Sequence, residues 1–108
     1  MTNLILSYKY PSICIPRVEM YIKKNDILNI FKKYHFGKIT KIDLIVFGKY
    51  KKAFIHLNWN VSIEKSVQVR NLLLNGLDFK IIYDYYNGWY WKCSASISHH
   101  NSPKITQP

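Results

Sequence analysis

Apolar residues recur along this chain with two different periods, and these periods predict an alternation of strands and helices. Ile13 and Ile15 alternate with other residues across 12–18, which is the pattern of a strand. Apolar positions at i, i+3, i+4 and i+7 begin at residue 27, and they predict an amphipathic helix that Gly37 ends. The same reasoning predicts strands over 38–47, 52–58 and 79–86, and a second helix from Asn60 or Ser62 to about Leu74.

A hairpin is predicted at Asn87-Gly88, because this dipeptide favours the tight turn that joins two antiparallel strands. A two-residue turn would pair Asp84 with Trp91 and add a fifth strand from Trp89 to about residue 95. Cross-strand partners share a face of the sheet. We therefore expect both tryptophans to lie on the outward face.

The predicted order β-α-β-β-α-β is that of a ferredoxin-like split βαβ fold, an α+β class with an antiparallel sheet, here with an added C-terminal hairpin strand. Ile27–Tyr34 with Gly37–Ile39 resembles the first helix and the second-strand entry of RNA recognition motif (RRM) domains, and the resemblance extends over about 13–83. Pro11–Val18 and the tryptophan-rich end are also similar to small RRM-like proteins encoded by giant DNA viruses.

In RRM domains, aromatic side chains on a hexapeptide and an octapeptide stack on RNA bases. The hexapeptide corresponds here to Ile13–Val18, in which Cys14 holds the aromatic position. The octapeptide corresponds to Tyr50–Leu57, where Lys52 holds one stacking position and Phe54 the other. This sequence thus keeps one of three aromatic positions, so the resemblance alone does not imply ordinary base readout.

Alternation along the third strand separates its side chains into two sets. The set that we expect to face the core is Ala53, Ile55 and Leu57, and the set that we expect on the open face is Lys52, Phe54 and His56. The core-facing set supports the predicted fold, and this support does not depend on what the open face binds.

The charge balance adds a functional indication. The chain has 16 Lys plus Arg against 6 Asp plus Glu, a formal net charge of +10. Such an excess is typical of proteins that meet phosphate backbones or another acidic surface. The abundance of Ile, Lys, Asn and Tyr, all encoded by A/T-rich codons, offers a compositional explanation of the same lysines. Both explanations stay open on the sequence.

Aromatic and basic residues together form a candidate binding surface, since bases stack on aromatic rings in an electropositive field. Two other interpretations compete with it: burial of the tryptophans against the sheet, and a protein interface in which they are central contacts. The basic loop between the second and third strands is either a solvated tip or a phosphate clamp. The candidate nucleic-acid-binding residues are Arg17, Lys49, Lys51 and Lys52 for phosphates, Phe54, Trp89 and Trp91 for bases, and His56 beside them.

Catalytic and metal chemistry find little support in the sequence. No close Cys and His pairs have zinc spacing, the acidic residues are scattered, and no glycine-rich phosphate loop occurs. Cys14 near His56 would imitate a catalytic dyad, but on an open sheet face. We expect no cofactor, no metal and no enzymatic activity, and we expect Cys14 and Cys93 to be free thiols.

The length fits one domain, which we place at 1–97, followed by a disordered tail over 98–108. No apolar run reaches the ~20 residues that span a bilayer, and the start lacks a signal-peptide pattern, so an intracellular site in the cytoplasm or nucleus is expected. We predict a module that binds single-stranded RNA with modest sequence preference. The alternative is a structural or adaptor module that binds protein or itself, including within a virus particle.

Overall fold

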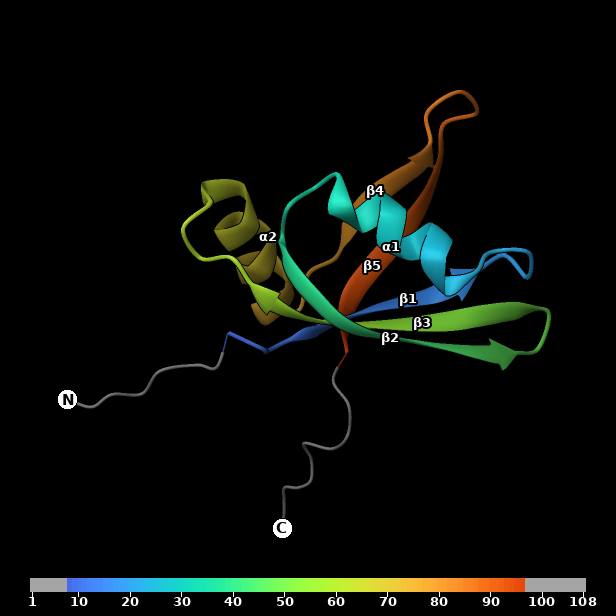
Figure 1. Cartoon of the computed structure of the whole chain (residues 1–108), viewed down its shortest axis with the longest axis horizontal. Coiled ribbons are helices and arrows are strands. Elements are labelled where there is room, and N and C mark those ends of the chain that lie inside the picture. The colour runs from blue at the N-terminus through green and yellow to red at the C-terminus, as the bar shows by residue number, and fades with distance from the viewer. Residues whose placement is uncertain (1–7, 97–108) are drawn as a thin grey trace, which may run out of the picture.

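The computed structural model describes residues 8–96, which form one antiparallel sheet with two helices on one of its faces (Figure 1). The strand order is β2-β3-β1-β5-β4. The elements in chain order are β1 (Ser12–Val18), α1 (Lys24–Lys32), β2 (Gly37–Phe47), β3 (Tyr50–Trp59), α2 (Glu64–Leu74), β4 (Phe79–Asp84) and β5 (Trp89–Ser96).

One hydrophobic core lies between the helices and the sheet. α1 contributes Ile27 and Phe31 to it, and α2 contributes Leu73. The sheet contributes alternate residues of its strands, as expected for a sheet covered on one face. The inward set predicted on β3 is confirmed: Ala53, Ile55 and Leu57 are buried.

The end of α1 differs from the sequence prediction. The left-handed residue that turns the chain after the helix is His35, with φ of 56°. Gly37 instead begins β2, opposite Trp59 of β3. The prediction that Gly37 ends the helix is therefore wrong.

The ferredoxin-like prediction is also wrong. In the split βαβ arrangement, the strand after the second helix returns to lie beside the first strand. Here β5 lies beside β1, and β4 is at the outer edge of a five-stranded sheet. Both strands of the hairpin pack on the core, with Trp91 and Cys93 of β5 buried and Phe79, Ile81 and Tyr83 of β4 against the same cluster. The added strand β5 pairs with β1 through Ser94–Ser96, so it takes the place that the split βαβ arrangement gives to the strand after the second helix.

The register of the β4–β5 hairpin differs from the predicted one as well. The chain turns over residues 85–88, and the strand pairing is irregular between Ile82 and Asp84, so Trp91 is opposite Ile81 rather than Asp84. The Asp84 carboxylate accepts hydrogen bonds from the backbone N–H and the side-chain amide of Asn87, at 3.1 and 2.9 Å. These bonds stabilise the longer turn. The irregularity between Ile82 and Asp84 changes the register by one residue, and it moves Trp91 from the outward face to the core.

The predicted tail over 98–108 lies outside the described residues. Within 8–96, neither helix has the length and apolar composition of a membrane span.

Candidate nucleic-acid interface

The sheet face opposite the helices, called the open face below, carries most of the candidate residues. Strand pairing places Asp43 of β2 and Cys14 of β1 on either side of Phe54 of β3. All three side chains are partly exposed. The predicted outward direction of Lys52, Phe54 and His56 agrees with this arrangement.

Two cations lie against aromatic rings at one end of the open face. Lys52 Nζ is 4.1 Å from the centre of the Phe47 ring, and the Arg17 guanidinium carbon is 5.0 Å from that of Tyr50. Arg17 reaches this position because β1 bulges between Ile15 and Val18. The exposed rings and the cations are therefore interleaved, as stacking on a charged strand requires.

A chain of hydrogen bonds crosses the open face on three strands. The Ser12 hydroxyl lies 2.8 Å from His56 Nδ1, and His56 Nε2 lies 3.0 Å from Asp43 Oδ2. The hydrogen bond with His56 lowers the pKa of Asp43, which also has Lys41 at 3.5 Å. Both ring nitrogens of His56 are engaged in this way, so the Cys14–His56 dyad considered from the sequence is not formed.

A hydroxyl, an imidazole and a carboxylate are also the groups of a serine-hydrolase relay. Hydrolysis needs, in addition, N–H donors aimed at the developing oxyanion. Ser12 pairs with Ser96 of β5, and the next residues, Ile13 and Cys14, pair with strands on both sides, so their amides lie within the sheet. The observed role of the chain of hydrogen bonds is to hold the His56 ring across β1, β3 and β2.

The two other predicted lysines do not lie on the open face. Lys51 points to the helix side of β3, where its ammonium donates a 2.7 Å hydrogen bond to the carbonyl of Ile22. Lys49 is exposed in the turn between β2 and β3. The structure therefore brings Lys52 and Arg17 together but separates them from Lys51.

The tryptophans lie differently from the prediction. Trp91 is 2% exposed and stacks on Tyr83, with ring centres 4.4 Å apart, so its predicted outward orientation is wrong. Trp89 is 50% exposed but lies on the same side as Tyr83, at 6.3 Å. Neither indole is beside Phe54.

Tyr90 and Lys92 take the outward positions on β5 instead. Tyr90 is 49% exposed, and Lys80 Nζ lies 4.5 Å from its ring centre. Lys92 pairs with Asp78 at 3.3 Å. Sequence reasoning missed Tyr90 because the predicted register was wrong, and it missed Phe47 and Tyr50 because it treated the turn between β2 and β3 as merely basic.

Comparison with known proteins gives no family for the chain. No protein-family model matches the sequence, and no solved structure matches the fold significantly. The resemblance to RRM domains stays a prediction. Among residues 8–96, no three His, Cys, Asp or Glu side chains are grouped so as to hold a metal ion.

Proposed function

We propose that the protein binds single-stranded RNA on the open face of its sheet. The observation that carries the proposal is the group of cations and aromatic rings at one end of the open face, where Lys52 lies against Phe47 and Arg17 against Tyr50. Phe54 and Tyr90 stack on bases in this account, while Lys52, Arg17 and Lys80 meet the phosphates. Both helices of residues 8–96 lie on the opposite face, so they leave this surface accessible.

The charge of the molecule supports the same proposal. The formal net charge is +10, and a basic surface attracts a polyanion over long range. Contacts with phosphates release counterions, so affinity falls steeply as salt rises. Stacking on aromatic rings accepts every base, which accounts for a modest sequence preference.

Fluorescence anisotropy with a random single-stranded RNA tests the proposal. We expect binding that weakens strongly between about 50 and 200 mM salt. Phe54→Ala removes a stacking ring worth about 1–3 kcal/mol, so affinity should fall about 5- to 150-fold. Lys52→Ala should cause a smaller loss that is the same for all sequences.

Two variants serve as matched controls. Tyr86→Ala removes an aromatic ring that is 96% exposed at the hairpin turn, and Lys32→Ala removes an exposed lysine of α1. Phe54→Ala should weaken RNA binding more than Tyr86→Ala does, and Lys52→Ala more than Lys32→Ala does. Absence of RNA binding even at low salt would refute the proposal.

A second candidate function is self-association, and the outer edge of β2 favours it. Ile45, Val46 and Phe47 are 51%, 60% and 62% exposed in consecutive positions on an edge strand. An exposed apolar edge can pair with a second copy of the chain. Sedimentation at micromolar concentration would then show a dimer that Val46→Lys abolishes, whereas a monomer at all concentrations excludes this function.

A further inference from the structure

β1 and β5 separate partway along the sheet and leave a gap between them. Their ladder runs only over Ser12–Cys14 of β1 and Ser94–Ser96 of β5. Beyond it lie two hollows of about 380 and 500 Å³. Glu19 and Tyr90 line both of them.

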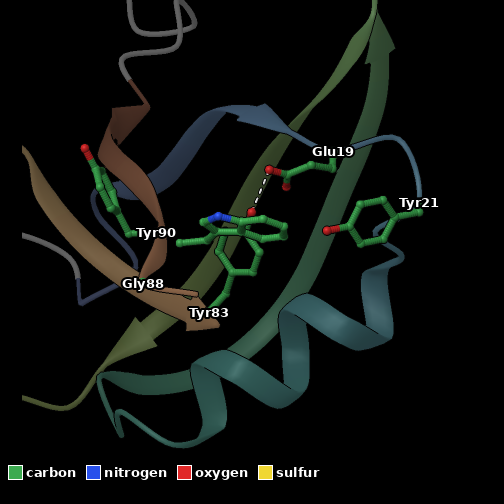
Figure 2. A pocket seen from close by; sticks show the side chains of 6 residues that line it. Glu19, Tyr21, Tyr83, Gly88 and Tyr90 are labelled. Carbon is green, nitrogen blue, oxygen red and sulfur yellow. Dashed lines mark hydrogen bonds between the residues drawn. The ribbon is translucent and has the colours of Figure 1, made fainter. Parts of the chain in front are cut away.

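Two donors hold the Glu19 carboxylate in this gap. The Tyr83 hydroxyl donates to Glu19 Oε2 at 2.6 Å, and the Trp91 indole N–H donates to Oε1 at 3.2 Å. Figure 2 shows the Tyr83 bond, with Tyr21 directed toward the same place. Burial first, and then the bond to Glu19, raise the pKa of Tyr83, so the hydroxyl keeps its proton.

Each oxygen of this carboxylate can accept a further hydrogen bond, because a carboxylate oxygen has two acceptor sites. The carboxylate is partly exposed, and its position is fixed by the stacked pair of Tyr83 and Trp91. It is therefore a preorganised pair of acceptors that opens into the two hollows.

The larger hollow adds groups of different chemistry. Arg17 and Lys92 line it together with Glu19, and Tyr90 contributes an aromatic ring. The two cations suit a phosphate, and the ring suits a planar base. A simple organic cation fits poorly here, because the same two side chains repel it.

The base that best matches Glu19 is guanine. Its N1–H and its 2-amino group are adjacent donors that can meet both carboxylate oxygens, whereas adenine, cytosine and uracil each present one donor group on the corresponding edge. Paired hydrogen bonds of this kind carry most direct base discrimination. We infer that the gap between β1 and β5 binds a guanine nucleotide, with Glu19 on the base, Tyr90 stacked on it, and Arg17 and Lys92 on the phosphate.

The guanine nucleotide can come from an RNA strand or be free in solution. The inference rests on the proposed function only in the first case. Titration of the full chain with GMP, IMP and AMP, followed by tryptophan fluorescence, tests the site itself. IMP lacks only the 2-amino group of GMP. We expect GMP to bind about 5- to 150-fold more tightly than either of the other two. Equal affinity for GMP and IMP would overturn the inference, and this comparison needs no variant.

Glu19→Gln supplies the protein-side test. Glutamine offers one acceptor and one donor, so the preference for GMP over IMP should fall to about equal affinity. Glu64→Gln removes an exposed carboxylate on α2 and should leave the preference for GMP over IMP unchanged. Thermal unfolding shows whether Glu19→Gln keeps the fold. If it does not, the ratio of the affinities for GMP and IMP, measured on the unsubstituted protein, still decides.

A second pair of ligands separates failure of this inference from failure of the proposed function. Single-stranded RNA with and without guanine is compared at the same salt concentration. If both strands bind equally and GMP is not preferred over IMP, RNA binding stands and the guanine site is refuted. If GMP is preferred over IMP but neither strand binds, the site stands for free nucleotides and RNA binding is refuted.

Discussion

Gly37 is a position where the structure excludes any side chain. An added Cβ would overlap the carbonyl oxygen of Asn58 on the neighbouring strand. Backbone atoms of a paired strand cannot move aside cheaply, so the close approach of β2 and β3 depends on glycine.

We therefore predict that Gly37→Ala destabilises the fold by about 1–3 kcal/mol, the range for overpacking. For a chain of this size, thermal unfolding should show a Tm lower by roughly 4–20 °C. Gly48→Asn is the control: Gly48 has φ of 67° with open space around it, and asparagine tolerates that conformation. Equal Tm values for Gly37→Ala and the natural sequence would contradict the crowding at Asn58.

Single residues on β3 were predictable because a strand alternates strictly. Ala53, Ile55 and Leu57 leave one choice of buried face, and Phe54 follows on the other. The same alternation places Lys51 on the helix side of β3, but it was not applied to this residue. Its ammonium donates a hydrogen bond to the Ile22 carbonyl. A long-range contact of this kind leaves no signal in the local sequence.

At the scale of elements, the β4–β5 hairpin shows how much depends on the register of one strand pair. The dipeptide Asn87-Gly88 correctly indicated a hairpin, but not the four-residue turn that Asp84 and Asn87 stabilise. The pairing also shifts by one residue between Ile82 and Asp84, and a one-residue shift moves the following side chains of β5 to the other face. Trp91 was therefore expected on the surface, where Tyr90 lies.

This register has an optical consequence. Trp91 and Trp59 are 2% and 3% exposed, whereas Trp89 is 50% exposed. We predict that acrylamide quenches only part of the tryptophan fluorescence of the folded protein, and that Trp89→Phe removes most of the quenchable part. Full quenching of the folded protein would show that the register is different. Unfolded protein in denaturant, where all three indoles are accessible, provides the reference.

At the scale of the whole molecule, the strand order was not predictable from the elements alone. The seven elements were expected in the observed order along the chain, yet two neighbours of β1 are possible on the side away from β3. β5 takes this place with Trp91 and Cys93 buried, and the inward direction of these two side chains became visible only with the correct hairpin register. The same wrong register placed Trp89 and Trp91 in the predicted binding surface.

The net charge of +10 also acts on the molecule as a whole. Self-repulsion destabilises a compact chain, and salt screens it. We predict that Tm rises when sodium chloride increases from about 10 to about 150 mM, where the screening length falls from ~30 to ~8 Å. Circular dichroism measures this directly. A lower Tm in salt would mean that ion pairs such as Lys92–Asp78 outweigh the repulsion.

The short ladder between β1 and β5 divides the sheet into a three-stranded unit and a two-stranded unit. Only three residue pairs join the units through the backbone, so their relative orientation depends on the shared core, to which Trp91 belongs, and on the Glu19 bonds. A ligand held by Arg17 from one unit and Tyr90 from the other would act as a cross-link between them. Substitutions that loosen this junction would then weaken binding without touching the ligand, and a bound nucleotide would make the whole sheet stiffer.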